Sequence, residues 1–182
     1  MALLDILIFP HKTLREPAKP VAKIDDEIRT LLDNMAETMV HAPGIGLAAP
    51  QVGVSQRVLV VDVTAMLPEG EKGLGLIKIV NPKIVDKSGL SSFEEGCLSL
   101  PGLLEVIERA AVIDLEYLDH EGKTCNLHAE GILATALQHE IDHLDGILIL
   151  DYISPLKRSR YKSMLKKQAK EKARESGSSA ET

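Results

Sequence analysis

Gln138-His139-Glu140-Ile141-Asp142-His143 is the stretch that decides the fold, because it predicts a helix whose metal site the rest of the chain must enclose. Residues four apart lie on one face of a helix, so the imidazoles of His139 and His143 can bind one metal ion. Glu140 follows the first ligand, where its carboxylate can take a proton from metal-bound water. Two histidines on an ordinary amphipathic helix, with a solvated glutamate between them, are the alternative interpretation.

The composition is typical of a globular protein. The chain has 182 residues, of which 45% are hydrophobic and 26% charged, so we expect one domain that buries most of its apolar surface. The chain does not begin with a basic region and a long apolar run, and no stretch approaches membrane-spanning length. We therefore expect a cytoplasmic protein that does not bind membranes. A reducing compartment would keep Cys97 and Cys125 as thiols.

Charge is distributed unevenly along the chain. The net charge is −6, but residues 157–175 contain nine Lys or Arg against two Glu. That segment therefore carries +7 and the remainder −13, which separates a basic tail from an acidic body. Ser154-Pro155 offers a cap and a first-turn proline for a basic last helix over residues 156–175. Residues 176–182 should be disordered.

Apolar periodicity predicts the elements that surround the metal motif. Apolar residues recur at helical spacing over residues 25–41. Strands are predicted by the β-branched and alternating patterns that follow, at residues 57–63, 77–85, 106–107, 111–118 and 123–128. Asn81-Pro82 interrupts the second of these strands, which should lie at a sheet edge or carry a bulge. The metal-binding helix should span residues 130–144 and end at Asp145-Gly146.

Two histidines do not complete a metal site. A catalytic site has three protein ligands and one open position, whereas a structural site has four ligands. Cys97 lies in a Gly-flanked turn that could aim its sulfur at the metal, and with two histidines and water it would make an open, catalytic site. The other candidates are several carboxylates, His120, Cys125 and His128. Cys125 and His128 lie on opposite faces of a predicted strand, which disfavours a shared metal.

The segment Gly44-Ile45-Gly46-Leu47-Ala48-Ala49-Pro50-Gln51 is small and apolar apart from its last residue. It could be a tight connection into the next strand, or a loop whose bare backbone lines a substrate groove. A lone G-x-G is a weak signal and by itself favours the structural interpretation. No strand pattern precedes it and no helix pattern follows, which excludes a dinucleotide-binding fingerprint.

Three motifs together resemble the signature motifs of peptide deformylases and stand in that family's order. They are residues 44–51, Glu95-Gly96-Cys97-Leu98-Ser99 and residues 138–143. The similarity extends to residues 10–15, 18–21 and 151–157, and so covers about residues 5–175. The resemblance implies a metallohydrolase that removes the formyl group from the N-terminal formyl-methionine of newly synthesised polypeptides and releases formate.

The resemblance also implies a role for each matching residue. Cys97, His139 and His143 would be the metal ligands, and Glu140 the general base while metal-bound water attacks the formyl carbon. The Gln51 side-chain amide and the Leu98 backbone N–H would stabilise the oxyanion. The implied substrate-binding positions are Gly44, Ile45, Gly46, Glu95, Gly96, Ile132, Thr135 and Ala136.

These implied substrate-binding positions change the interpretation of residues 44–51. A substrate strand can lie against Gly44 and Gly46 by backbone hydrogen bonds, so the groove interpretation of this loop now prevails. Ile45, Ile132, Thr135 and Ala136 would form the methionine pocket with Glu95 at its rim, as the family implies. Thr135 and Ala136 are small for a snug methionine pocket, so this pocket should be wider.

The identity of the metal has two interpretations. Ligand types alone suggest zinc. The resemblance implies Fe(II) as the working ion, with zinc, nickel or cobalt as substitutes. Arg109 and Asp142 could form an ion pair that steadies the helix, with an exposed Arg109 as the alternative.

Two rival functions stay open at this point. A zinc endopeptidase would leave Cys97 without a role, and a structural metal module would be closed by Cys125 or His128. The basic helix is either a solvated surface or, as the resemblance implies, a docking element for the ribosome. We expect a monomer with one catalytic domain over residues 1–175. Its fold should be α+β, with antiparallel sheets packed around a central metal-binding helix and with an N-terminal and a C-terminal helix.

Overall fold

The computed structural model describes residues 2–178, and the side chains of residues 2–168. In this part of the chain the helices are α1 (Asp26–His41), α2 (Gly131–Leu144) and α3 (Pro155–Ser178). The strands are β1 (Gly46–Ala48), β2 (Val58–Val61), β3 (Ile77–Ser88), β4 (Ser91–Gly96), β5 (Leu104–Arg109), β6 (Val112–Leu118) and β7 (Thr124–Glu130). The predicted α+β class is confirmed.

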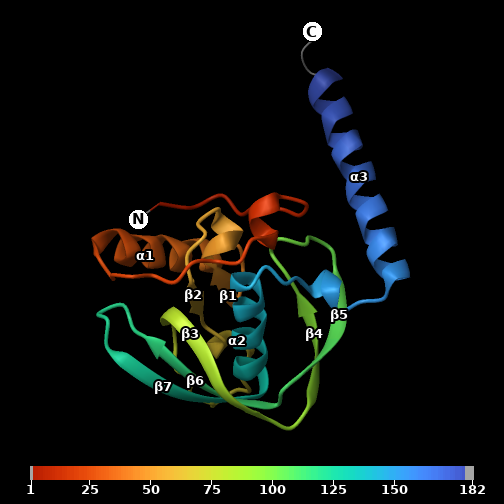
Figure 1. Ribbon diagram of the computed structural model, residues 1–182. Coiled ribbons are helices and arrows are strands. Elements are labelled where there is room, and N and C mark those ends of the chain that lie inside the picture. Colours follow the sequence, from red (N-terminus) through yellow and green to blue (C-terminus); the bar gives the residue numbers. More distant parts are fainter. Residues whose placement is uncertain (1, 179–182) are drawn as a thin grey trace. The chain divides into compact units, whose positions relative to one another are not determined.

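The strands form a five-stranded sheet in the order β1-β2-β3-β6-β7 and a two-stranded sheet of β4 and β5 (Figure 1). Each pair of neighbouring strands is antiparallel. Helix α2 packs against strands of both sheets and lies between them in Figure 1. Antiparallel sheets around the motif-bearing helix were predicted from the sequence, and the structure confirms them.

Strand β2 lets the larger sheet carry a helix on each face. All four of its residues, Val58–Val61, are buried. Successive side chains of a strand point to opposite faces. Leu59 and Val61 therefore join the core beneath α2, while Val58 and Val60 join the core that includes the apolar side of α1. Because both faces are covered, this strand is apolar throughout instead of alternating.

Helix α1 begins after an acidic residue that caps it. The Asp25 carboxylate accepts a hydrogen bond from the backbone N–H of Ile28 at 3.1 Å, which is the geometry of an N-cap. The apolar stripe of the helix is buried, with Leu32 and Met35 fully inaccessible. The helix predicted over residues 25–41 is confirmed.

Asn81-Pro82 produces a bulge in a central strand. Strand β3 lies between β2 and β6, so the edge alternative is wrong. Its pairing with β6 shifts register between Val80 and Lys83, and Asn81 has a φ of 51°. The Asn81 amide accepts from the Val21 N–H at 2.8 Å and donates to the Val21 C=O at 2.9 Å. The bulge is thus held by side-chain hydrogen bonds where a proline prevents a regular ladder.

Strand β7 passes directly into α2. Glu130 ends the strand, and Gly131 begins the helix with a φ of 57°, a conformation that glycine adopts without strain. At the other end, the N–H of Ile147 donates to the C=O of Asp142 at 2.8 Å, which closes the helix at the predicted Asp145-Gly146 stop. The predicted helix over residues 130–144 is confirmed, with its start at residue 131.

Strands β1 and β4 were not predicted. The three residues of β1 pair with Leu59–Val61 at the edge of the larger sheet. The polar β4 pairs with β5 and ends at Gly96, immediately before Cys97. Strand β1 therefore lies within the motif of residues 44–51, and β4 leads directly into the loop that carries Cys97.

The chain divides into two compact units, Met1–Leu148 and Ile149–Thr182, and all predicted site residues belong to the first. In the second unit, the Ser154 hydroxyl accepts from the Lys157 N–H at 3.3 Å at the start of α3. Helix α3 begins one residue before and ends three residues after its predicted range. Residues 179–182 of the predicted disordered tail lie outside the described residues. Among residues 2–178, no helix is both long enough and apolar enough to cross a membrane.

Candidate active site

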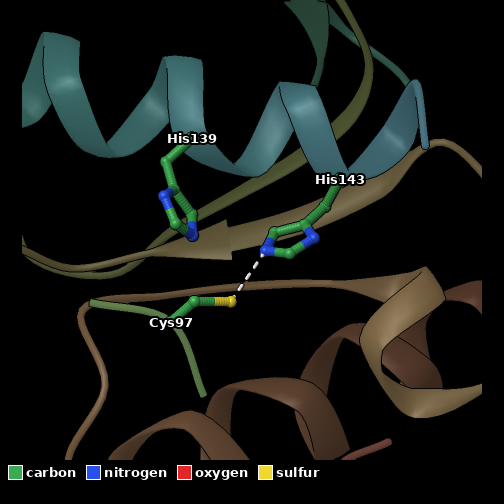
Figure 2. A group of neighbouring side chains, drawn as sticks. All are labelled: Cys97, His139 and His143. Atoms are coloured by element: carbon green, nitrogen blue, oxygen red, sulfur yellow. Dashed lines mark hydrogen bonds between the residues drawn. The ribbon is translucent and has the colours of Figure 1, made fainter. Parts of the chain in front are cut away.

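Three potential metal ligands meet beside α2 (Figure 2). His139 and His143 come from α2, and Cys97 comes from the loop that follows β4. Their ligand atoms all lie within 4.8 Å of one another, with the Cys97 Sγ 3.2 Å from the His143 Nε2. Figure 2 shows the thiol and both imidazoles turned toward a common point. The spacing of the helix motif and the Gly-flanked cysteine therefore predicted one cluster.

The donor set fits a divalent metal ion. One thiolate and two imidazoles leave an open coordination position, which is the arrangement of catalytic sites. Burial lowers the pKa of His143 well below its usual value, so its ring is neutral and can bind a metal. Burial also lowers the pKa of His139, but hydrogen bonds with Cys97 and Glu95 outweigh this and raise it to about 10. The surroundings of His139 therefore favour positive charge, which a metal ion can supply instead of a proton.

The other candidate ligands lie away from this group. Cys125 contacts Asp119, with Sγ 3.9 Å from Oδ2. His128 contacts Asp114 and Glu130 on an exposed part of β7, at 2.6 and 3.1 Å. Among the described residues, neither joins the Cys97 cluster. The structure therefore gives no support to a module in which either residue closes a four-ligand site.

Glu140 is buried next to the ligands and is only 4% exposed. Burial raises the pKa of its carboxyl to about 7, and Oε2 has no hydrogen-bond partner among the described residues. A carboxyl that titrates near neutrality can both accept and return a proton. Gly46 makes room for it, because a Cβ at that position would overlap the Glu140 carboxylate. The motif of residues 44–51 thus needs a glycine at position 46 to leave space for Glu140, which belongs to the motif of residues 138–143.

The Gln51 amide is held in one orientation. Its Oε1 accepts from the backbone N–H of Ala48 at 2.8 Å, which turns Nε2 toward the metal ligands. Nε2 lies 3.7 Å from the Cys97 Sγ and 3.3 Å from the Ser99 Oγ. The Leu98 N–H, next to Cys97, donates no hydrogen bond within the described part of the chain. Two neutral donors therefore stand close to the cluster, as stabilisation of an oxyanion requires.

Arg109 forms a buried ion network behind the ligands. Its Nε and Nη2 donate to the two carboxylate oxygens of Glu95 at 2.5 and 2.9 Å, and its Nη1 donates to Asp142 at 2.8 Å. Arg109 is 6% exposed, so the predicted pair with Asp142 is confirmed and an exposed Arg109 is wrong. Burial raises the pKa of Glu95, but hydrogen bonds from His139 and Arg109 outweigh it and keep the pKa below its usual value.

Glu95 has a different place from the one predicted. It borders the cleft but is buried, not at a solvent-exposed rim. Arg109 binds both of its oxygens, and His139 contacts one of them. The Glu95 Oε2 lies 2.9 Å from the His139 Nδ1, which leaves the His139 Nε2 for the metal. Such a contact fixes the orientation of a ligating ring. No local pattern could indicate this contact, because the two residues are 44 positions apart in the sequence.

A cleft of about 540 Å³ opens beside these groups. All predicted substrate-binding positions line it, namely Gly44, Ile45, Gly46, Glu95, Gly96, Ile132, Thr135 and Ala136. The predicted catalytic residues Gln51, Leu98 and Glu140 line it as well. Lining residues that the sequence did not indicate include Pro43, Met66, Glu94, Leu100, Leu103 and Leu104. Pro43, Leu100 and Leu103 come from loops, where no periodic pattern marks the side that faces a cleft.

The geometry agrees with the comparison to known proteins. The sequence profile described as polypeptide deformylase matches residues 3–159. The chain belongs to this family. A peptide deformylase of Alkalilimnicola ehrlichii is 52% identical over 167 residues, which cover 92% of this chain and 91% of the relative. One of Rhizobium meliloti is 53% identical over 159 residues, or 87% of this chain and 89% of the relative.

Solved structures of peptide deformylases share the fold. The enzyme of Legionella pneumophila superposes with a TM-score of 0.84 at 44% identity, over 95% of this chain and 99% of the other. The enzyme of Ehrlichia chaffeensis in complex with actinonin gives a TM-score of 0.87 at 44% identity, over 92% and 98% of the two chains. Deformylases are metal-dependent, and the Cys97, His139 and His143 group can hold the ion in this chain.

Proposed function

We propose that this chain is a metal-dependent hydrolase that removes the N-formyl group from the N-terminal formyl-methionine of newly synthesised polypeptides and releases formate. One observation carries the proposal: Cys97, His139 and His143 meet beside a cleft that is lined by Cys97, His139, the buried Glu140 and the oriented Gln51. Membership of the deformylase family supports the choice of substrate. An endopeptidase would leave the thiol of Cys97 without a role.

Cys97, His139 and His143 would hold one divalent ion, and we propose Fe(II), with zinc, nickel or cobalt as substitutes. When bound, the ion would polarise the formyl group and lower the pKa of water toward about 7. The choice of Fe(II) rests on resemblance to the family. Full activity of protein with verified zinc and no iron would contradict it, as judged by metal analysis after anaerobic purification.

Glu140 transfers the proton in this mechanism. Its carboxylate accepts a proton from the attacking water and returns it to the nitrogen of the leaving amine. A pKa of about 7 suits both steps, because neither protonation state is strongly disfavoured near neutral pH. Burial also keeps bulk water from competing for this proton.

Gln51 and Leu98 stabilise the oxyanion that develops on the formyl oxygen. The Gln51 Nε2 and the Leu98 N–H are uncharged donors beside the proposed metal ligands. One such donor typically contributes about 2.7–4 kcal/mol of transition-state stabilisation. Because Gln51 Oε1 is already bonded to Ala48, the amide does not need to reorganise during the reaction.

The peptide part of the substrate pairs with β1. This strand is at the edge of the larger sheet, with β2 on one side only. Backbone hydrogen bonds to a sheet edge bind extended peptides with little regard to sequence, which suits a substrate set as broad as newly synthesised chains. The methionine side chain enters the pocket of Ile45, Ile132, Thr135 and Ala136.

Formate release from a formyl-Met dipeptide tests the proposal. The metal-loaded parent should release formate, whereas Glu140→Ala should retain the metal and lose turnover. A metal-loaded parent without turnover would contradict the proposed function and favour a non-catalytic metal module. Binding of actinonin, seen in the Ehrlichia chaffeensis deformylase, would additionally support a shared cleft.

We also propose that the basic residues of 156–175 dock the protein on the ribosome in the cytoplasm, where its substrate emerges, and that it acts as a monomer. The charge of +7 over residues 157–175 suits rRNA phosphates, and such binding should weaken steeply with salt. Deletion of the residues after Leu156 should abolish co-sedimentation with ribosomes. Unchanged co-sedimentation would contradict docking through this helix, and light scattering would test the monomer.

A further inference from the structure

Ser99 is buried behind the proposed oxyanion donor Gln51. It belongs to the loop that follows β4 and is 0% exposed. Its Oγ lies 3.3 Å from the Gln51 Nε2, and its backbone C=O accepts from the Phe9 N–H at 3.0 Å. The hydroxyl is therefore carried by a backbone that is itself held in place, and it contacts a side chain of the proposed catalytic machinery.

The chemistry of the two groups fixes the direction of this hydrogen bond. The Gln51 Oε1 accepts from the Ala48 N–H at 2.8 Å, which identifies the opposite end of the amide as its nitrogen. An amide nitrogen donates two hydrogen bonds and accepts none, so the Ser99 oxygen is the acceptor. One of the two Nε2 hydrogens is therefore committed to Ser99.

The second Nε2 hydrogen remains for another partner. Nε2 also lies 3.7 Å from the Cys97 Sγ, on the side of the proposed metal ligands. The terminal torsion of glutamine has a broad energy profile, so an amide held only through its oxygen could still turn. Hydrogen bonds at both ends of the Gln51 amide, to Ala48 and to Ser99, restrict this rotation.

We propose that Ser99 is a positioning residue for the reaction: its hydroxyl accepts one N–H of Gln51, so that the other N–H is directed at the oxyanion. Ser99 does not line the cleft, so it acts through Gln51 and not on the substrate. The orientation matters most in the transition state, because only there does charge develop on the formyl oxygen. This inference rests on the proposed function and adds a residue to it.

A double-mutant cycle tests the inference by formate release from a formyl-Met dipeptide. The variants are Ser99→Ala, Gln51→Ala and the double variant, each metal-loaded and assayed for metal content. Ser99→Ala should lower kcat by between about twofold and tenfold, the equivalent of one neutral hydrogen bond, and leave KM and the metal content unchanged. In the Gln51→Ala background the same substitution should lower kcat no further, because the amide that Ser99 orients is absent.

Thr38→Val is the matched control for the loss of a buried, hydrogen-bonded hydroxyl. Thr38 is 4% exposed and does not line the cleft. Its Oγ1 accepts from the Leu4 N–H at 3.0 Å and donates to the Asn34 C=O at 2.7 Å. Thr38→Val should lower the melting temperature but keep the parent's kcat, which separates a loss of stability from a loss of orientation.

Four results would contradict the proposal. An unchanged kcat in Ser99→Ala would overturn it, and so would an equal loss of kcat in Thr38→Val. An equal loss with and without Gln51 would mean that Ser99 acts independently of the amide, and a loss of metal in Ser99→Ala would mean that it supports the ligands; either would overturn the inference. A metal-loaded parent that releases no formate would instead overturn the proposed function, and this inference with it.

A spectroscopic measurement does not depend on turnover. NMR of the zinc-loaded, substrate-free protein reports the two Nε2 protons of Gln51, and their disappearance in Gln51→Ala assigns them. Because a hydrogen-bonded amide proton resonates downfield, one of the two should move upfield in Ser99→Ala, whereas Thr38→Val should leave both in place. Unmoved Gln51 resonances in Ser99→Ala would overturn the inference.

Discussion

Arg109 binds both carboxylate oxygens of Glu95, at 2.5 and 2.9 Å, from the neighbouring strand of the β4–β5 hairpin. This bidentate pair holds the carboxylate whose Oε2 contacts the His139 Nδ1 at 2.9 Å. A bidentate guanidinium–carboxylate pair has a fixed geometry, so it transmits the rigidity of the hairpin to a proposed metal ligand on α2. Asp142, the other carboxylate that Arg109 binds, belongs to the same helix.

Arg109→Met should strongly destabilise the fold. The substitution removes the guanidinium from the buried carboxylate of Glu95 and from the partly buried one of Asp142, and breaking a buried ion pair typically costs about 3–5 kcal/mol. Urea unfolding measures this change in the free energy of unfolding. Arg57→Met is the matched control, because the pair of Arg57 with Asp145 is partly exposed and should contribute about 1 kcal/mol or less. Equal losses in the two variants would contradict a special role for the buried network.

Glu95→Gln should weaken metal binding while the chain still folds. The amide keeps the shape of the side chain but removes the charge that orients His139 and favours positive charge at its ring. Loss of such a supporting contact typically lowers metal affinity about 10–100-fold. Competition with a chelator measures the affinity, and Glu94→Gln on the exposed side of β4 is the control. Equal affinities in the two variants would refute the orienting role.

Gly46→Ala should lower kcat/KM for a formyl-Met peptide by at least about tenfold and leave the metal in place. The added Cβ overlaps the Glu140 carboxylate, which must then move from the position in which it transfers the proton. Gly44→Ala is the useful comparison, since its Cβ meets only the end of the flexible Leu98 side chain. Its loss should be smaller, and a larger loss than in Gly46→Ala would argue against the packing of Gly46 on Glu140.

Glu140 should make the stability of the metal-free protein depend on pH. Burial raises the pKa of Glu140 from 4.5 to about 7, so the folded state holds the proton more tightly than the unfolded state. The resulting stabilisation is fully present below pH 4.5 and is lost as the pH rises through about 7. The shift corresponds to roughly 3 kcal/mol.

Urea unfolding of the parent and of Glu140→Gln in the presence of a chelator measures this dependence. The free energy of unfolding of the parent, relative to that of the variant, should decrease between pH 5 and pH 8. A constant difference across that range would mean that Glu140 is ionised throughout.

Much of the site follows from local sequence alone. The i,i+4 spacing places His139 and His143 on one helix face, because 3.6 residues per turn bring such positions together whatever surrounds them. The apolar stripe of α1 and its Asp25 cap are local in the same sense, and the stripe was predicted. The motifs around Gly46 and Cys97 identified the groups that meet in the cleft, through resemblance to a family.

Only the tertiary structure determined how these groups are supported. Strand β1 has three residues and β4 is polar, so neither has a periodic pattern long enough to predict it. The contact of Glu95 with Arg109 and His139 joins two strands and a helix, and a carboxylate on a polar strand gives no indication of partners 14 and 44 positions away. Ser99 was part of a motif in the sequence, but its contact with Gln51 could be recognised only when its surroundings were known. Chemical identity and helical spacing are local properties of the chain, whereas burial and long-range pairing depend on how the elements pack.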